Sequence, residues 1–169
     1  MKKTKILIFA KTYPQPSSKY VETVCAGGAL EDGTLIRLFP ITFRLLPLDK
    51  RFKRYQWIEA DIRKSGSDNR KESFRINQDS TKKISPVLSC SSSWAARRRI
   101  LLKKQAPSLE YLNELHELDG TSLGIIRPKE VEEFRVKPKD LSSQRKAELL
   151  SAQNDLFRAE LQPLRLAPL

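Results

Sequence analysis

Residues 11–44, KTYPQPSSKYVETVCAGGALEDGTLIRLFPITFR, decide the fold expected for this chain. Within them, Tyr20–Ala26 and Thr34–Phe39 alternate in the way that is typical of half-buried β-strands. Gly27-Gly28 predicts a bulge or bend, and Asp32-Gly33 predicts a hairpin turn. Lysine, arginine and tyrosine residues gather at the strand ends. The pattern indicates a small β-barrel that displays positive charge and aromatic rings, as surfaces that hold single-stranded nucleic acid do.

Composition limits the size of the protein and indicates the class of its partner. The chain has 169 residues, which predicts one domain or two very small ones, and its 39% hydrophobic residues suffice for a modest core. The 32 lysines and arginines exceed the 20 acidic residues and give a formal net charge of +12. Such an excess attracts polyanions, of which nucleic acid is the commonest. The alternative is a basic but otherwise ordinary domain.

Cysteine content and hydropathy indicate the compartment. The two cysteines, Cys25 and Cys90, do not make a disulfide framework, so a reducing, cytoplasmic location is expected. The N-terminal apolar run at residues 6–10 is too short for the core of a signal peptide. Because no segment approaches the length of a membrane span, no membrane partner is expected.

Further strands are predicted on both sides of the opening stretch. Lys5–Ala10 is short and apolar and predicts a buried first strand. Tyr55–Arg63 predicts another, with Ile58, Ala60 and Ile62 on its core face. Ser73–Ile76 predicts a short strand, whereas the signal over residues 77–93 is weak.

The second half of the chain predicts helices and two more strands. A first helix is expected over Trp94–Gln105, with Ser92 or Ser93 as its cap. A second is expected to begin at Ser108 and to end at Asp119-Gly120. The remaining predicted elements are strands at Leu123–Ile126 and Val131–Val136 and an apolar-striped helix at Ser143–Leu161.

The chain resembles the bacterial dual OB-containing domain proteins. The motifs that carry the resemblance are KTYP at 11–14, ETVCAG at 22–27, IRLFP at 36–40, FKRYQWI at 52–58 and LGIIRP at 123–128. The resemblance implies two OB-like barrels and, by fold analogy, nucleic-acid binding, and it brings no catalytic residue. The C-terminal tail departs from the family pattern, so the second barrel is expected to be incomplete or to be completed by another polypeptide.

The expected architecture is therefore a β-rich α+β protein. Residues 1–88 are expected to form an OB-like β-barrel. Residues 89–169 are expected to form a helical segment, a small, incomplete second β unit and the C-terminal helix. That helix is expected to cover the second β unit or to pair with another copy or another protein.

The predicted function is non-catalytic binding of nucleic acid, with single strands favoured. The predicted contacts are Lys11, Tyr13, Lys19, Tyr20, Arg37, Phe39, Arg44 and Arg54. Alternatively, the rings pack against the barrel, the lysines are solvated, and Arg37 pairs with Glu22 or Glu59. At least one residue of Arg97–Arg99 must face outward on its helix, where it either contacts phosphate or is solvated.

Two rival functions are open. Glu22, Glu59 and Asp61 could hold the metal ion of a small nuclease, although such strand residues are commonly solvated, paired charges. The other rival is an adaptor subunit that docks on a larger protein complex. A Cys25–His116 dyad is weighed against a buried strand cysteine and a packed helix histidine. We predict no catalytic residue, no metal site and no cofactor, because neither a zinc ligand set nor a nucleotide-binding motif is present.

Overall fold

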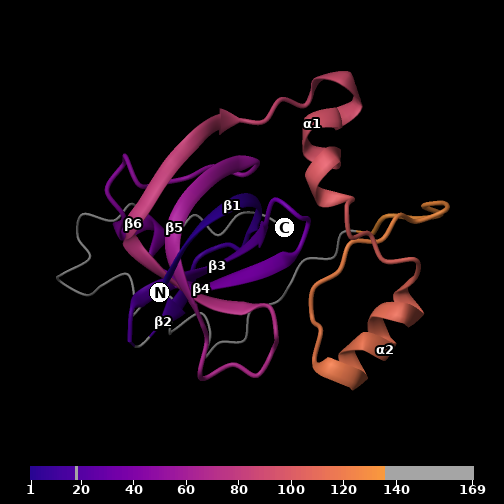
Figure 1. Ribbon diagram of the computed structural model, residues 1–169, viewed down its shortest axis with the longest axis horizontal. Coiled ribbons are helices and arrows are strands. Elements are labelled where there is room, and N and C mark those ends of the chain that lie inside the picture. The colour runs from indigo at the N-terminus through magenta and orange to yellow at the C-terminus, as the bar shows by residue number, and fades with distance from the viewer. Residues whose placement is uncertain (18, 136–169) are drawn as a thin grey trace.

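The computed structural model describes residues 1–17 and 19–135 (Figure 1). Six strands are followed by two helices, which makes a strand-rich α+β structure. The elements in chain order are β1 (Lys2–Lys11), β2 (Gln15–Ser17), β3 (Val21–Ala29), β4 (Leu35–Ile41), the 3-10 turn η1 (Phe43–Leu45), β5 (Gln56–Lys64), β6 (Ser73–Val87), α1 (Ser91–Leu101) and α2 (Leu109–Asp119).

Five of the strands close into a barrel. The sheet order is β1-β5-β6-β4-β3-β2, and an additional pairing between β1 and β3 joins its two sides. The β4–β6 pair is parallel, whereas the other neighbours in the barrel are antiparallel. β2 lies outside the ring and pairs with β3 alone. β1 pairs with β5 over residues 2–8 and with β3 over residues 7–11, and its register against β3 shifts between Ile8 and Ala10.

Alternation along the strands fills the barrel. Ile36 and Leu38 of β4 point inward. Ile58, Ala60 and Ile62 of β5 do so too, which confirms the core face predicted for that strand. The remaining core side chains come from β1, β3, β4, β6 and the η1–β5 loop and are Ile6, Ile8, Val24, Ala26, Ile41, Leu46, Phe52 and Ile76.

Two glycines shape the first hairpin. A Cβ on Gly28 would lie 2.4 Å from Cγ2 of Ile6, so only glycine lets β3 approach β1 this closely. Gly33 adopts a φ of +86°, and its N–H donates to the Leu30 carbonyl at 2.9 Å. The predicted Asp32-Gly33 turn is confirmed, and the Asp32 side chain accepts from the Thr34 N–H at 2.9 Å.

The prediction for the strand after Ser73 was too short. β6 continues through the segment of weak signal to Val87 and pairs with β5 from Lys64↔Phe74 to Gln56↔Val87. Most of its residues are polar and only partly buried, so hydrophobic periodicity does not reveal them. Backbone pairing with β5 holds the segment in the barrel.

Both predicted helices are present, but only α2 begins with the predicted cap. The Ser108 side chain caps α2 by accepting from the Tyr111 N–H, and Gly120 ends α2 with a φ of +71°. Neither Ser92 nor Ser93 caps α1, because both adopt positive φ in a left-handed turn. No helix in the described part of the chain is both long and apolar enough to cross a bilayer.

The predicted strands at Leu123–Ile126 and Val131–Val136 are wrong as far as the structure describes them. Residues 121–135 contain no strand. Backbone groups that would join a sheet instead bond elsewhere, as where the Ala106 N–H donates to the Ile125 carbonyl at 2.8 Å. Val136 and the predicted helix at Ser143–Leu161, with its expected role in association, lie outside the described residues.

Candidate nucleic-acid interface

β4 carries two of the predicted contact residues on its outer face. Because Ile36 and Leu38 fill the barrel, the alternate residues Arg37 and Phe39 point away from it. The Phe39 side chain is 47% exposed. The strand therefore presents an aromatic ring and a cation two residues apart on one surface.

The Arg37 guanidinium donates to a cysteine and a serine side chain and to no carboxylate. Nη1 donates to Cys25 Sγ at 3.9 Å, and Nη2 donates to Ser122 Oγ at 3.3 Å. Its Nε is buried without a hydrogen-bond partner. Arg37 pairs with neither Glu22 nor Glu59, so that alternative is wrong. No ion pair within residues 1–17 and 19–135 neutralises its charge.

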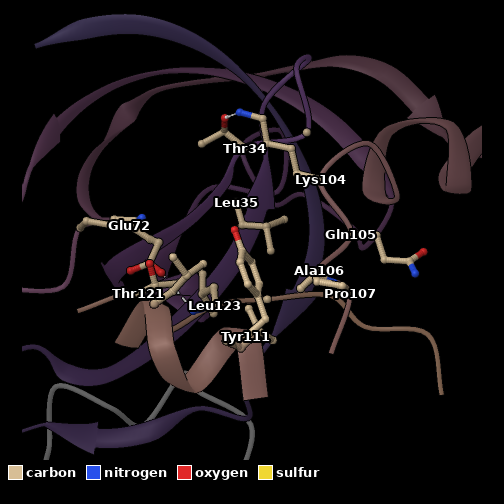
Figure 2. A pocket seen from close by; sticks show the side chains of 15 residues that line it. Thr34, Leu35, Glu72, Lys104, Gln105, Ala106, Pro107, Tyr111, Thr121 and Leu123 are labelled. Atoms are coloured by element: carbon tan, nitrogen blue, oxygen red, sulfur yellow. Dashed lines mark hydrogen bonds between the residues drawn. The ribbon is translucent and has the colours of Figure 1, made fainter. Parts of the chain in front are cut away.

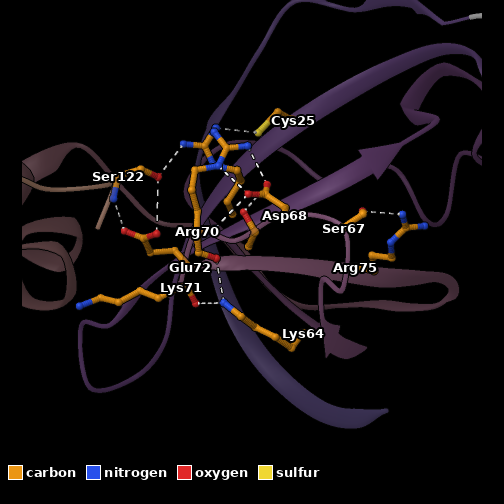
Figure 3. A network of polar contacts seen from close by, with 11 residues as sticks. Cys25, Lys64, Ser67, Asp68, Arg70, Lys71, Glu72, Arg75 and Ser122 are labelled. Atoms are coloured by element: carbon orange, nitrogen blue, oxygen red, sulfur yellow. Dashed lines mark hydrogen bonds and ion pairs between the residues drawn. The ribbon is translucent and has the colours of Figure 1, made fainter. Parts of the chain in front are cut away.

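The β5–β6 loop brings a second arginine to the same region (Figure 3). Arg70 Nε and Nη2 donate to the two oxygens of Asp68 at 2.8 and 2.7 Å. These bonds, followed by one from Ser73, hold the pKa of Asp68 well below its usual range. Asp68 also raises the pKa of Arg70, to which Cys25 and Glu72 contribute in lesser degree. Arg70 is thus oriented toward the Cys25 surface by its own loop.

Glu72 fixes the other border of this surface. Its side chain is buried, and Oε1 accepts the backbone N–H groups of Ser122 and Leu123 at 2.6 and 3.0 Å (Figure 3). The Glu72 carbonyl accepts the Arg37 N–H at 2.8 Å. One residue thereby ties β4 to the segment that follows α2.

Lys11 is not available in the way that the sequence predicted. Its ammonium group lies 3.7 Å from the centroid of the Phe43 ring and donates to the Phe52 carbonyl at 3.1 Å. Partial burial lowers the pKa of Lys11, and the charge of Arg54 lowers it further. Lys11 therefore stabilises the η1–β5 loop.

Arg44 is likewise committed inside the protein. It forms an ion pair with Glu22, whose side chain is only 2% exposed. Glu22 is consequently not free to join Glu59 and Asp61 as a metal ligand. Glu59 lies instead on β5, within 3.7 Å of Lys3. No group of three or more His, Cys, Asp or Glu side chains in the described ranges is placed to hold a metal ion.

The other predicted contacts lie at the surface. Tyr13 is 47% exposed and follows Thr12, whose N–H donates to the Cys25 carbonyl at 2.9 Å. Lys19 and Arg54 are exposed, and Lys19 Nζ lies 5.4 Å from the centroid of the Tyr20 ring. The β1–β3 connection therefore runs beside the surface formed by Cys25, Arg37 and Phe39.

The Cys25–His116 dyad is absent. Cys25 is partly buried beside Arg37, and His116 Nδ1 lies 3.0 Å from the Thr121 carbonyl. The histidine thus closes the end of α2. The expectation of a fully buried cysteine is corrected to a partly buried one on the outer face of the barrel.

A separate cavity of about 430 Å³ lies between the barrel and α2 (Figure 2). Its walls are mostly apolar and include Leu35, Leu112 and Leu123. The two lysines at its border are already paired, Lys71 with Asp119 and Lys104 with Asp32. With its cations engaged, the cavity offers less to a charged ligand than the Arg37 surface does.

Sequence reasoning missed Arg70 and Glu72. Arg70 follows Asp68 by two residues in a serine- and glycine-containing loop, where an aspartate and an arginine commonly pair locally. The spacing of Asp68 and Arg70 could therefore have predicted their pairing. Glu72 had none, because its partners lie 50 residues further along the chain.

The fold and this surface define a strand-rich α+β protein whose closed five-stranded barrel presents an arginine and an exposed ring side by side. The chain belongs to the family described as Domain of unknown function (DUF8758), whose model matches residues 2–103. The matched region contains the whole barrel and α1. No curated protein and no solved structure gives a significant match to the chain.

Proposed function

We propose that this protein binds single-stranded nucleic acid on the outer surface of β3 and β4 and does so without catalysis. The observation that carries the proposal is the pair formed by Arg37 and Phe39. Arg37 retains a charge that no hydrogen-bonded carboxylate neutralises, and Phe39 exposes its ring two residues away. In a bound single strand, the arginine would contact a phosphate and the phenylalanine ring would stack on a neighbouring base.

The topology supports an OB-like reading of the barrel. Its five strands pair in the cyclic order β1-β3-β4-β6-β5. OB barrels bind oligonucleotides over their second and third strands and the loops between strands one and two and between strands four and five. In this chain those are β3, β4, the connection that carries Tyr13 and the loop that carries Arg70. The proposed surface therefore coincides with the region that an OB-like fold would use.

The contact set differs from the one predicted from the sequence. Phe39 and Tyr13 supply rings, and Arg37 contacts the phosphate backbone. More distant charges, among them Arg70 with its bond to Asp68, steer the ligand. Lys11 and Arg44 are left out because their charged groups contact Phe43 and Glu22. Tyr20, Lys19 and Arg54 are kept only as more distant groups.

The test is fluorescence anisotropy with labelled single-stranded DNA, single-stranded RNA and duplex DNA, each at 50 and 200 mM salt. We expect single strands to bind more tightly than duplex and affinity to fall with salt. Phe39→Ala should weaken binding by about 1–3 kcal/mol, whereas Phe134→Ala, which removes an exposed ring outside the barrel, should not.

A charge variant tests the other half of the pair. Arg37→Gln should reduce the salt slope by about one unit. Lys82→Gln is the matched control, because Lys82 is exposed on β6 opposite Glu59. Binding that is absent, or that does not change with salt, would overturn the proposal.

A further inference from the structure

The segment that enters α1 has an unusual backbone. Ser92, Ser93 and Trp94 have φ values of 51°, 52° and 65°, which places three consecutive residues with side chains in the left-handed region. This geometry is disfavoured for residues that carry a Cβ, because the Cβ approaches the following carbonyl oxygen. Backbone of this kind is concentrated at binding and switch sites. Here it presents Trp94 with 54% of its surface exposed.

An arginine is fixed next to this tryptophan. The Arg97 guanidinium carbon lies 3.9 Å from the centroid of the Tyr55 ring and 5.7 Å from that of Trp94. Its Nε and Nη2 both donate to the Leu88 carbonyl, at 3.0 and 2.8 Å. All these partners are neutral, so the positive charge of Arg97 is not cancelled by a bonded carboxylate. The three side chains form a cluster, the Tyr55–Arg97–Trp94 cluster, whose geometry is set by the barrel.

The cluster adjoins the basic end of the barrel. Tyr55 directly follows the exposed Arg54, and its N–H donates to the Ile8 carbonyl at 2.5 Å. Leu88 follows the last residue of β6, and α1 lies beside the barrel where β6 ends (Figure 1). The match to the family also extends through α1. The cluster therefore belongs to the same module as the proposed binding surface.

We propose that Trp94 is a second stacking position for the same single-stranded nucleic acid, and that Arg97 supplies positive charge beside it. This inference rests on the proposed function and extends it from β4 to α1. The neighbours of Trp94 decide the class of ligand. Along the chain they are the serines of 91–93, two small alanines at 95–96 and the arginines of 97–99, a largely polar and basic setting that suits a phosphate-linked aromatic base. An aliphatic peptide or a lipid chain would require apolar neighbours.

Intrinsic fluorescence can isolate this position because the chain has only two tryptophans, Trp57 and Trp94. In a Trp57→Phe protein, Trp94 is the sole tryptophan. We expect a 15-nucleotide single strand to quench its emission, whereas a 4-nucleotide strand, held at the β4 surface alone, should leave it unchanged. Anisotropy with the same labelled strands reports binding independently of the tryptophan.

Substitution gives the affinity readout. Trp94→Ala should weaken binding of the 15-nucleotide strand about 5- to 100-fold and leave the 4-nucleotide strand unaffected. Trp94→Phe keeps an aromatic ring and should recover part of the lost affinity. Such a recovery would show that the turn still folds when Trp94 is replaced. Tyr111→Ala is the matched control, because Tyr111 is 42% exposed on α2.

The outcomes separate this inference from the proposed function. If the long strand binds but Trp94 emission is unchanged and Trp94→Ala binds normally, the second position is wrong and the β4 surface stands. If neither strand binds the wild-type protein, both are overturned.

Discussion

The partly exposed Arg44 and the buried Glu22 form a bidentate ion pair. Arg44 Nε lies 2.9 and 2.7 Å from the two carboxylate oxygens, and Nη2 lies 2.6 Å from Oε2. Glu22 is at the start of β3 and Arg44 is in η1, so the pair fixes the 3-10 turn to the barrel. Arg44, which the sequence predicts to contact a ligand, therefore stabilises the turn after β4.

Removing one partner of this pair should destabilise the fold. Arg44→Ala leaves the carboxylate of Glu22 buried without its cation, which typically costs about 3–5 kcal/mol. Urea unfolding should show this loss. The double variant Glu22→Gln, Arg44→Met, with no buried charge, should lose clearly less than Arg44→Ala. If Arg44→Ala leaves stability unchanged and weakens binding, Arg44 is a ligand contact after all.

Lys11→Met should also act on stability rather than on nucleic-acid binding. The change keeps the aliphatic stem but removes the ammonium group from the Phe43 ring and from the Phe52 carbonyl. We expect a loss of about 1–2 kcal/mol by urea unfolding and no change in the salt slope. Lys53→Met, at an exposed position in the same loop, should leave stability unchanged. A reduced salt slope for Lys11→Met would contradict this assignment.

Glu72→Ala should release the segment that follows α2. The carboxylate accepts two backbone N–H groups, and hydrogen bonds to a charged acceptor are worth about 1.5–3 kcal/mol. Hydrogen exchange should become faster at the amides of Ser122 and Leu123 while that of the core strands stays slow. Glu117→Ala, an exposed change on α2, is the control. Unchanged protection at both amides would show that other contacts hold the segment.

Modification of Cys25 should block the proposed surface. In a Cys90→Ser background, a bulky maleimide on Cys25 would stand beside Arg37, whose Nη1 lies 3.9 Å from the sulfur. We expect affinity for single strands to fall at least about tenfold, or 1.4 kcal/mol. Cys25→Ala should bind normally and lose about 1 kcal/mol of stability or less. Full binding after complete modification would show that the ligand does not bind over β3.

The Asp68–Arg70 pair predicts a dependence of stability on pH. The folded-state pKa of Asp68 is lowered, chiefly by the hydrogen bonds from Arg70. Ionised Asp68 therefore stabilises the fold above its unfolded pKa of about 3.9. This contribution is lost as pH falls through the folded pKa. Asp68→Asn should therefore lower the melting temperature at pH 7, and the difference from wild type should narrow from pH 5 toward pH 2. Asp49→Asn, an exposed change, should show no such pattern.

The strands were predictable where burial imposes a period, and the use of the charges was not. Ile36 and Leu38 alternate with Arg37 and Phe39, so their faces follow from the order of residues. Nothing local distinguishes Arg44 from an arginine in solvent, because it meets Glu22 only through the pairing of β3 with β4. The prediction of a second β unit failed for a related reason, since the backbone N–H groups of Ser122 and Leu123 bond to Glu72 rather than to a strand.

Closure of the barrel also bears on self-association through backbone pairing. β2 lies at the end of the strand order, and no strand in the part of the chain that the structure describes pairs with its outer side. It has only three residues, and its middle residue, Pro16, has no N–H to donate. A short edge interrupted by proline is a poor template for intermolecular strand addition. The β2 edge should therefore not support strand pairing between molecules, in spite of the high strand content of the barrel.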